Sequence, residues 1–395
     1  MTRAALSCRI CEESQPLAPL SSCAVCGGPL DVHYDWDETP AFRDVPSMWR
    51  YEALLPHGGD GSIPGGTPLV PAATLSDALG IELHLKLESA NPTHSFKDRL
   101  AATAVAAAKA FGLQTLCCAS RGNLGDALAS ACAAAGLEAV VLTPAGERNA
   151  AARPAAYGAG TFDVRGTYEE CRELERELEP LFPWGFLEGN LHAFAVEGAK
   201  TISYEIAEQL GGHAPDAVVS PLASGTLLSK LAQGFAELKE LGLMNGSPPP
   251  RQFGAQPEGC PPVAMAWADE RPLSRVTPDT VAHSLAVGDP RHGDLALGAA
   301  RITGGSIASV PESRIASSTE LLAETSGVYA DTAGGVALGA LLQLVRTGAI
   351  EPGARVVLVV TGSGVKPGGA DAGRPSHEID ADAESFLSAL GVDSG

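Results

Sequence analysis

Short apolar runs alternate with amphipathic, alanine-rich segments along most of the chain. The apolar runs have the length of buried strands, and the longer segments have the apolar spacing of helices. We predict strands at residues 83–87, 116–119, 139–143, 217–220 and 356–361, and helices at 95–111, 123–135, 148–157 and 226–241. Strands and helices that alternate in this way predict an α/β fold with mainly parallel sheets. In such folds ligands bind at the carboxyl ends of the strands.

Composition changes along the chain and indicates where its parts begin and end. The 395 residues are enough for two domains and an appendage. Residues 35–66 are polar and contain several prolines and glycines, as linkers do, and residues after Lys366 are acidic, with one amphipathic stretch at 383–390 in an expected mobile tail. The expected parts are an N-terminal segment (1–34), a large domain in two pieces (35–114 and 201–366), a small α/β domain (115–200) and the tail (367–395).

The charge balance argues against some classes of partner. The chain carries 27 basic and 47 acidic residues, a formal net charge of −20. Such a surface repels nucleic-acid phosphates and anionic lipids, so we expect neither a nucleic-acid nor a membrane partner. No run of about 18 apolar residues occurs, and residues 1–10 do not have the pattern of a secretory signal. We therefore expect a cytoplasmic protein with reduced cysteines.

Two pairs of cysteines near the N-terminus have the spacing of a metal site. Cys8 and Cys11 form one Cys-x-x-Cys knuckle, and Cys23 and Cys26 form a second one after eleven intervening residues. Four thiolates in this pattern can hold a tetrahedral zinc ion, as in a zinc ribbon. A closed four-cysteine site has no open coordination position, so its role would be structural. The alternatives are a ribbon that holds no metal and a pair of disulfides.

The segment around Lys97 carries the clearest chemical signal. Lys97 lies near the start of a predicted helix in apolar surroundings, where desolvation and the positive helix end favour the neutral amine that condenses with aldehydes. Taken alone, this is a weak signal, because lysines early in helices are usually solvated. However, Asn91-Pro-Thr-His-Ser-Phe-Lys-Asp-Arg99 resembles the Schiff-base segment of the pyridoxal 5′-phosphate (PLP) enzymes of fold type II, and of threonine synthases in particular. His94 stands where that family has glycine.

A second stretch, Ala119-Ser-Arg-Gly-Asn-Leu-Gly125, is similar to the Ser-Thr-Gly-Asn loop of the same family. The resemblance implies that the loop binds the substrate carboxylate and that Asn123 contacts the 3-hydroxyl of the cofactor. Backbone N–H groups at the start of a helix favour an anion there. The residues assigned to this loop are Ser120, Arg121, Gly122 and Asn123.

Two further junctions resemble the family's cofactor-binding loops. Residues Ala223, Ser224, Gly225 and Thr226 follow the predicted strand 217–220 in the place of the phosphate loop. Thr361 and Ser363 lie in a Thr-Gly-Ser-Gly turn that resembles the one facing the pyridine nitrogen in threonine synthases. A neutral hydroxyl at that place would not enforce a protonated ring.

The resemblance extends over nearly the whole chain. It includes the N-terminal ribbon, which some threonine synthases have, and the stretches 66–69, 197–201 and 324–331. It implies two open, twisted, mainly parallel sheets with helices on both faces, and a homodimer. His192, His283 and His292 have no spacing typical of metal ligands, and we expect them to lie at the surface or to be satisfied by hydrogen bonds.

Three positions differ from the family pattern and affect the expected substrate. Arg121 replaces a small hydroxyl residue and adds a bidentate donor beside the expected carboxylate site, although it could also point to solvent. His94 adds bulk, and a possible proton shuttle, next to Lys97. Ala195 lies where threonine synthases have an arginine that can serve an anionic group of the substrate.

The resemblance therefore implies a PLP-dependent carbon–oxygen lyase that acts on a small amino acid. Lys97 would hold the cofactor and would move the Cα proton as general base and acid, before a β- or γ-leaving group departs. A threonine synthase-like conversion of phosphohomoserine to threonine is the first interpretation. One alternative is a β-replacement or β-elimination enzyme similar to cysteate synthase or to the serine/threonine dehydratases. A non-catalytic PLP-fold binding protein is the other.

Overall fold

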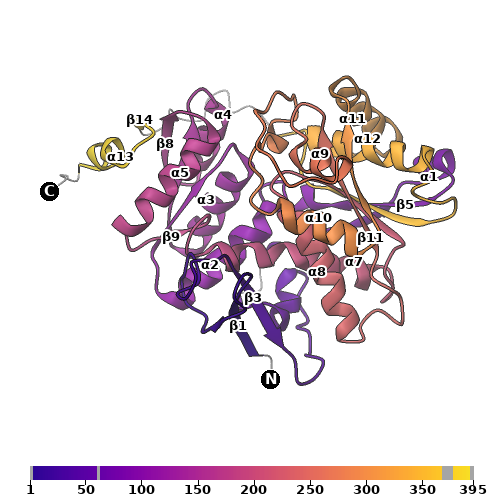
Figure 1. Ribbon diagram of the computed structural model, residues 1–395, viewed down its shortest axis with the longest axis horizontal. Coiled ribbons are helices and arrows are strands. Elements are labelled where there is room, and N and C mark those ends of the chain that lie inside the picture. The colour runs from indigo at the N-terminus through magenta and orange to yellow at the C-terminus, as the bar shows by residue number, and fades with distance from the viewer. Residues whose placement is uncertain (1–2, 60–62, 367–376, 392–395) are drawn as a thin grey trace. The chain divides into compact units, whose positions relative to one another are not determined.

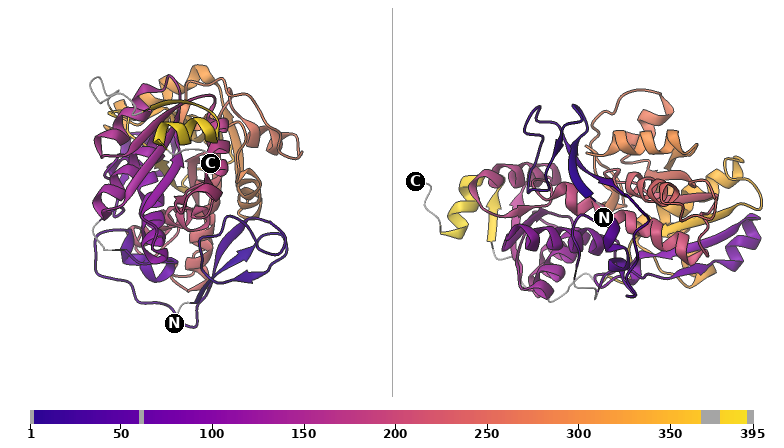
Figure 2. Two further views of the ribbon diagram at one scale, coloured as in Figure 1. Left: turned by 90° about the vertical axis from the view of Figure 1, so that its left-hand side faces the viewer. Right: turned by 90° about the horizontal axis from the view of Figure 1, so that it is seen from below.

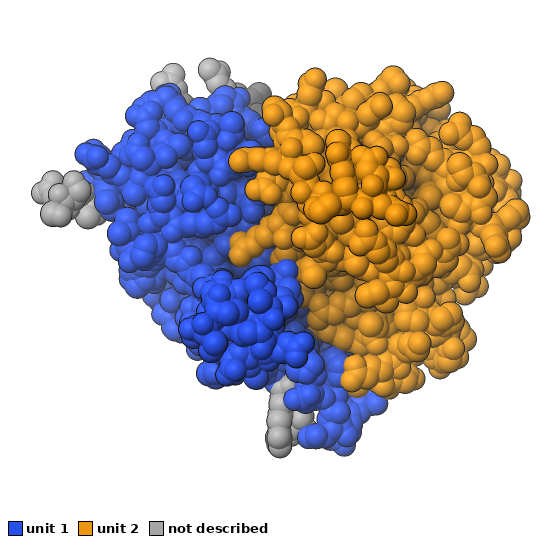
Figure 3. All heavy atoms as spheres, in the orientation of Figure 1, with its two compact units in different colours: residues 1–64, 97–198, 367–395 blue, residues 65–96, 199–366 orange. Residues whose placement is uncertain are grey.

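The computed structural model describes residues 3–59, 63–366 and 377–391. The chain divides into two compact units, which Figure 3 shows in different colours. Unit 1 comprises Met1–Pro64, Lys97–Gly198 and Pro367–Gly395, and unit 2 comprises Gly65–Phe96 and Ala199–Lys366. Among the described residues, no helix is both long and apolar enough to cross a membrane.

Unit 1 is built around a five-stranded, fully parallel sheet in the order β14-β8-β7-β6-β9. Its strands are β6 (Thr115–Ala119), β7 (Glu138–Pro144), β8 (Gly160–Arg165), β9 (Gly185–Phe186) and β14 (His377–Asp380). Its helices are α2 (Lys97–Phe111), α3 (Asn123–Ala135), α4 (Arg148–Ala156), α5 (Tyr168–Leu178), α6 (His192–Ala195) and α13 (Ala383–Leu390), with the 3-10 turns η1 (Met48–Leu54), η3 (Glu179–Leu181) and η4 (Val196–Lys200).

Strand β6 is buried on both faces, as the continuous apolar run 116–119 predicts. Leu116 and Cys118 face a core formed with α2 and α3, whereas Cys117 and Ala119 face a second core that includes α5. Helices therefore cover both faces of the sheet (Figure 1). The side-chain alternation of a strand accounts for this division.

The N-terminal residues of unit 1 form a small antiparallel sheet in the order β2-β1-β3, drawn in indigo in Figure 2. Its strands are β1 (Arg3–Cys8), β2 (Ser14–Gln15) and β3 (Leu30–Asp35). The buried residues Leu6, Leu30, Val32 and Tyr34 belong to the same core as α2 and α3. The segment that differs in composition therefore has no core of its own.

Unit 2 contains a six-stranded sheet in the order β12-β11-β10-β13-β5-β4, in which only the edge strand β4 is antiparallel. The strands are β4 (Leu69–Pro71), β5 (Glu82–Leu87), β10 (Ala217–Pro221), β11 (Arg251–Pro257), β12 (Ser306–Val310) and β13 (Arg355–Val360). The helices are α1 (Ala73–Leu79), α7 (Thr201–Gln209), α8 (Thr226–Glu240), α9 (Pro262–Ala268), α10 (Gly293–Ile302), α11 (Glu312–Ser326) and α12 (Thr332–Arg346), with the 3-10 turns η2 (Glu88–Ala90) and η5 (His283–Leu285). The predicted α/β class with mainly parallel sheets is confirmed.

Two local predictions differ from the structure. The helix predicted from Ser95 begins at Lys97, because Ser95 bridges to Gly362 and the N–H of Phe96 donates to the carbonyl of Thr361 at 3.1 Å. The predicted mobile tail is wrong for residues 377–391. There, β14 pairs with β8, and the ring of Phe386 is buried 4.5 Å from the ring of Phe162. Residues 367–376 and 392–395 of that tail lie outside the described residues.

Candidate active site

Lys97 occupies the first position of α2, directly after Phe96. Burial lowers the pKa of Lys97, and the electrostatic effects of Glu188 and Cys118 oppose this shift. A lowered pKa increases the share of neutral amine, which is the nucleophilic form. The chemistry that the sequence predicts for Lys97 is therefore consistent with its surroundings.

The predicted carboxylate loop joins β6 to α3 in unit 1. The Oγ atom of Ser120 accepts hydrogen bonds from the N–H groups of Gly122 (3.0 Å) and Gly125 (2.8 Å), which folds the loop over the start of the helix. Gly122 has a φ of 146°, a conformation that side chains rarely tolerate. Asn123 is the first residue of α3, where helix geometry leaves N–H groups without helical partners. The loop thus has the geometry of an anion site.

Arg121 lies on this loop and is ion-paired. Its Nε atom is 3.0 Å from Oε1 of Glu147, and its guanidinium lies 5.9 Å from the centre of the Tyr168 ring. The side chains of Arg121 and Glu147 are 27% and 30% exposed, so the pair is only partly open to solvent. Arg121 is therefore held beside the loop and does not extend freely outward.

A buried glutamate, Glu175, holds the strand end from which the loop starts and also bonds to the backbone of a second glutamate, Glu188; the sequence revealed neither role. Glu175, on α5, accepts hydrogen bonds at 2.8 Å from the N–H of Ala119, at the end of β6, and from the N–H of Glu188, just after β9. Burial raises the pKa of Glu175 to about 8. The carboxylate of Glu188 pairs with Arg172 at 3.1 Å. Glu175 lies 56 residues from Ala119, so no local pattern could have linked them.

The predicted phosphate loop joins β10 to α8 in unit 2. Gly225 has a φ of 93°, and a Cβ atom there would lie 2.2 Å from the carbonyl oxygen of His292. The hydroxyls of Ser224 and Thr226 are 3.0 Å apart, and Thr226 Oγ1 lies 3.1 Å from Nδ1 of His292. The N–H of His292 donates to the carbonyl of Ser224 at 2.8 Å. His292 is buried and hydrogen-bonded, which is one of the two environments expected for this residue. Its contacts stabilise the loop at residues 223–226, and the sequence contained no indication of this connection.

This loop fits a phosphate group. A Cβ atom at position 225 would collide with the backbone of His292, so glycine is required there. The hydroxyl of Ser224 lies just before a 15-residue helix and that of Thr226 on its first residue. Backbone N–H groups, small residues and hydroxyls at a helix start are the donors that hold phosphates in proteins. Ala223 is partly exposed at the beginning of the loop.

The turn with Thr361 and Ser363 follows β13 in unit 2. Gly362 bridges to Ser95, Ser363 bridges to Ala330, and the Gly362 carbonyl accepts a hydrogen bond from the N–H of Asp331 at 3.2 Å. A Cβ atom at Gly362 would lie 2.4 Å from the carboxylate of Asp331. The turn is therefore fixed between the segment that precedes Lys97 and the start of α12.

His94 lies in the stretch that is bonded to this turn. Its φ is 62°, which explains why a glycine suits this position, and histidine tolerates it at some cost. The side chain is exposed, with Nδ1 3.2 Å from the carbonyl oxygen of Ser89. Its predicted contact with substrate remains a prediction.

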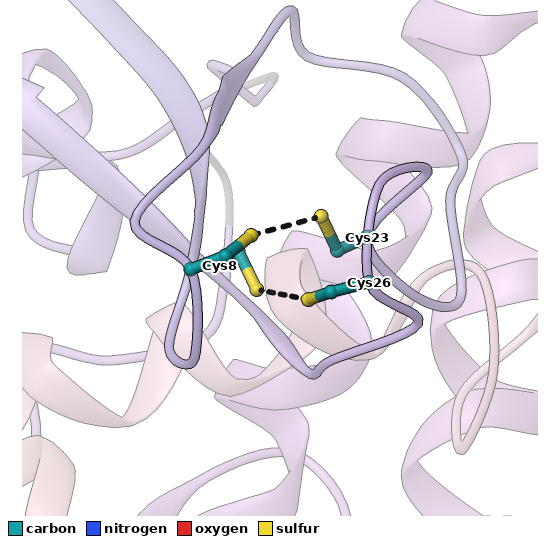
Figure 4. Close-up of side chains that lie close together, drawn as sticks. Cys8, Cys23 and Cys26 are labelled. Atoms are coloured by element: carbon teal, nitrogen blue, oxygen red, sulfur yellow. Dashed lines mark hydrogen bonds between the residues drawn. The ribbon is translucent and has the colours of Figure 1, made fainter.

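The four N-terminal cysteines come together in unit 1. Figure 4 labels three of them, Cys8, Cys23 and Cys26. The four sulfur atoms all lie within 4.8 Å of one another, with Cys8 Sγ 3.4 Å from Cys26 Sγ and Cys11 Sγ 3.7 Å from Cys23 Sγ. Four thiolates at about 2.3 Å from a tetrahedral zinc would be about 3.8 Å apart, so the cluster fits this ion. Backbone N–H donors lower the pKa of Cys8 to about 6, which favours its thiolate.

Comparison with known proteins gives consistent results. The family described as "Pyridoxal-phosphate dependent enzyme" matches residues 62–362. Threonine synthase of Methanosarcina acetivorans is 34% identical over 356 residues, which cover 86% of this chain and 86% of that protein. Threonine synthase of Methanocaldococcus jannaschii is 32% identical over 362 residues, covering 86% of this chain and 87% of the other.

Solved structures share the fold at lower sequence identity. Maize serine racemase is 20% identical, with a TM-score of 0.64, over 76% of this chain and 89% of that one. Threonine deaminase isoform 2 of Solanum lycopersicum is also 20% identical, with a TM-score of 0.65, over 76% of this chain and 79% of the other.

Proposed function

The chain belongs to the family of pyridoxal-phosphate dependent enzymes, and on this basis we propose that it is a threonine synthase-like lyase that acts on a small amino acid. The observation that carries the proposal is the identity of 34% to a threonine synthase over most of both chains. Lys97 lies within residues 62–362, which match the family. The proposed partner is therefore a phosphorylated or similarly activated amino acid.

Each unit, taken by itself, has residues that suit one part of PLP. Lys97 offers a desolvated amine, the Ala223–Thr226 loop offers a phosphate cradle, and Thr361 and Ser363 offer neutral hydroxyls for a ring nitrogen. When bound, PLP supplies an electron sink that stabilises negative charge at the Cα atom of an amino acid. If Thr361 or Ser363 faced the ring nitrogen, a neutral hydroxyl would not enforce protonation of the ring, and the electron sink would be weaker than with a carboxylate partner.

The chain's own residues then have distinct tasks. Lys97 removes the proton from Cα and returns it, and its lowered pKa keeps the amine available as a base. The Ser120–Asn123 loop holds the substrate carboxylate with backbone N–H groups and so orients the Cα–H bond toward the base. Glu175 keeps the end of β6 in place, and the loop begins there.

Absorption spectroscopy of the purified protein tests the cofactor and its lysine. We expect a long-wavelength band that borohydride removes and that Lys97→Ala lacks. Lys109→Ala, an exposed lysine on the same helix, is the matched control and should keep the band. A protein that stays colourless after PLP is added would contradict the proposal. A coloured protein that turns over no amino acid would favour a non-catalytic binding protein.

A β-replacement or β-elimination enzyme is the second candidate, and a specific observation favours it. Ala195 is buried, and its carbonyl accepts a hydrogen bond from Thr103 Oγ1 at 2.8 Å, so this position offers a substrate no charged group. Arg121 lies instead beside the Ser120–Asn123 loop. Phosphate release from phosphohomoserine and from phosphoserine, each with a nucleophile, separates the candidates: release only from phosphoserine would rule out the threonine synthase-like reaction.

We also propose a cytoplasmic homodimer. The reduced cysteines, the acidic surface and the family resemblance support this assignment. Light scattering coupled to size-exclusion chromatography measures the mass directly, and a mass near 40.4 kDa would indicate a monomer instead.

A further inference from the structure

The four-cysteine cluster closes the end of the small N-terminal sheet. Cys8 is the last residue of β1 and pairs with Leu30, the first residue of β3. The other knuckle, with Cys23 and Cys26, lies just before β3. Gly28 fits so tightly that a Cβ atom there would lie 2.9 Å from the Cys8 sulfur. A zinc ion bound to all four sulfurs would therefore fix the start of β3 relative to β1, since such ions supply much of the folding energy of small ribbons.

Strand β3 carries a side chain that reaches the middle of unit 1. Tyr34 is 5% exposed, and its hydroxyl donates a 2.6 Å hydrogen bond to Oε2 of Glu197, which is 0% exposed. The two residues are 163 positions apart in the chain. The Tyr34 ring also stacks on Trp36, with the ring centres 5.5 Å apart. A buried hydrogen bond between a hydroxyl and a carboxyl oxygen is costly to break, because it leaves a buried polar group without that partner.

Glu197 precedes a glycine that lies against the first turn of α2. A Cβ atom on Gly198 would be 2.1 Å from the carbonyl oxygen of Arg99 and 2.9 Å from Thr103 Oγ1. The same threonine hydroxyl donates to the carbonyl of Ala195 at 2.8 Å. The backbone on either side of Glu197 is thus in direct contact with α2. Arg99 is only two residues after Lys97, the first residue of this helix.

We propose that Tyr34 and Glu197 are positioning residues that link metal binding at Cys8, Cys11, Cys23 and Cys26 to the placement of Lys97. With zinc bound, β3 holds the Tyr34 hydroxyl against Glu197, and the 197–198 backbone in turn holds the first turn of α2. Without metal the N-terminal sheet is less firmly held and the hydrogen bond between Tyr34 and Glu197 weakens. The amine of Lys97 is then less well placed to react with the aldehyde of PLP. The inference rests on the proposed role of Lys97 and adds to it a regulatory metal of the divalent, thiophilic class.

The test uses the full chain and a readout at Lys97 itself. PLP is added to cofactor-free protein, samples are reduced with borohydride over time, and the modified Lys97 peptide is measured by mass spectrometry. A general amine-reactive ester gives a second rate for the same lysine without PLP. Zinc content is measured in parallel. The samples are zinc-loaded protein, chelator-stripped protein, stripped protein with zinc restored, and the Tyr34→Phe variant in the loaded and stripped states.

Tyr34→Phe removes only the hydroxyl and leaves the stacked ring, so it should keep its zinc. In this variant we expect PLP to modify Lys97 about fivefold more slowly than in wild type, which corresponds to the loss of one buried hydrogen bond. Stripping the wild type should slow the reaction at least as much, and zinc should restore it. Removing zinc from Tyr34→Phe should slow the modification of Lys97 little further, because both changes act on the same hydrogen bond. Tyr157→Phe, a surface tyrosine of unit 1, is the matched control and should behave like wild type.

Several results would overturn the proposal. One is a chain that contains no zinc and takes up none when zinc is added. Another is a rate of Lys97 modification that changes neither when zinc is removed nor in the Tyr34→Phe variant. Fully additive effects of the two changes would show that they act separately. If PLP does not attach to Lys97 at all, the proposed function fails, whereas the rate with the amine-reactive ester still decides whether the metal and Tyr34 control this lysine.

Discussion

The Oγ1 atom of Thr226 lies 3.1 Å from Nδ1 of His292, and both side chains are buried. Thr226 begins α8 at the predicted phosphate loop, and His292 directly precedes α10. The histidine also donates its backbone N–H to Ser224. One residue of unit 2, distant in sequence, therefore fixes both the backbone and a hydroxyl of this loop.

The first prediction concerns His292. Replacing it with alanine leaves a buried hydroxyl short of a partner, which costs about 1–3 kcal/mol. We expect His292→Ala to weaken PLP binding about tenfold, measured by titrating the cofactor-free protein and following absorbance. His283→Ala, at an exposed histidine, is the control. Equal PLP affinity in both variants would mean that His292 does not support the loop.

The second prediction separates backbone strain from steric contact at Gly225. Gly225 and Gly242 both have a positive φ, 93° and 71°, but only at Gly225 would a Cβ atom meet other atoms, 2.2 Å from the His292 carbonyl oxygen. Gly242→Ala should cost about 1 kcal/mol of unfolding free energy and leave PLP affinity unchanged. Gly225→Ala should cost more and abolish measurable PLP binding. Retention of PLP by Gly225→Ala in a spectroscopic titration would place the phosphate elsewhere.

The third prediction is a pH dependence from Glu175. Burial raises its pKa from 4.5 to about 8, so the folded state keeps a proton that the unfolded state loses. Its contribution to stability is therefore present below pH 4.5 and is lost as the pH rises toward about 8. Glu175→Gln should be less stable overall, because one N–H donor loses its acceptor. In this variant the free energy of unfolding should also lack the decrease with pH that Glu175 causes in wild type.

Urea unfolding midpoints across this pH range, for wild type and Glu175→Gln, give the comparison. The difference between the two proteins should shrink as the pH rises, since other titrating groups contribute equally to both. Glu177→Gln, an exposed residue of the same helix, controls for the general effect of removing a carboxylate. A difference that is constant with pH would show that Glu175 is ionised in the folded protein throughout.

The fourth prediction concerns Arg121 and substrate choice. Its ion pair with Glu147 is partly exposed, so Arg121→Ala should change the unfolding free energy by no more than about 1 kcal/mol. If Arg121 binds a second anionic group of the substrate, KM should rise about tenfold with kcat largely kept. Arg176→Ala, which breaks an exposed pair with Glu173, is the control. An unchanged KM for every substrate that is turned over would assign Arg121 a structural role only.

The sequence by itself determined the class of fold, and by local pattern it predicted the loops that carry the candidate site. Helix 123–135 begins and ends where the pattern predicted, the amphipathic stretch 383–390 forms a helix with the same bounds, and the three loops at residues 120, 223 and 361 all follow buried strands. These features depend on neighbouring residues: apolar runs that form strands, glycines that permit tight turns, and helix starts that attract anions. The cysteine spacing belongs to the same class, because each knuckle is only four residues long.

Only the tertiary structure decided which distant residues support those loops. Glu175 bonds to Ala119 across 56 residues, His292 to Thr226 across 66, and Tyr34 to Glu197 across 163. The polar strand His377–Asp380 likewise gains its place only by pairing with β8. A buried polar side chain must find a partner, but the sequence does not specify which one, because the partner is set by how helices and strands pack once the whole chain has folded.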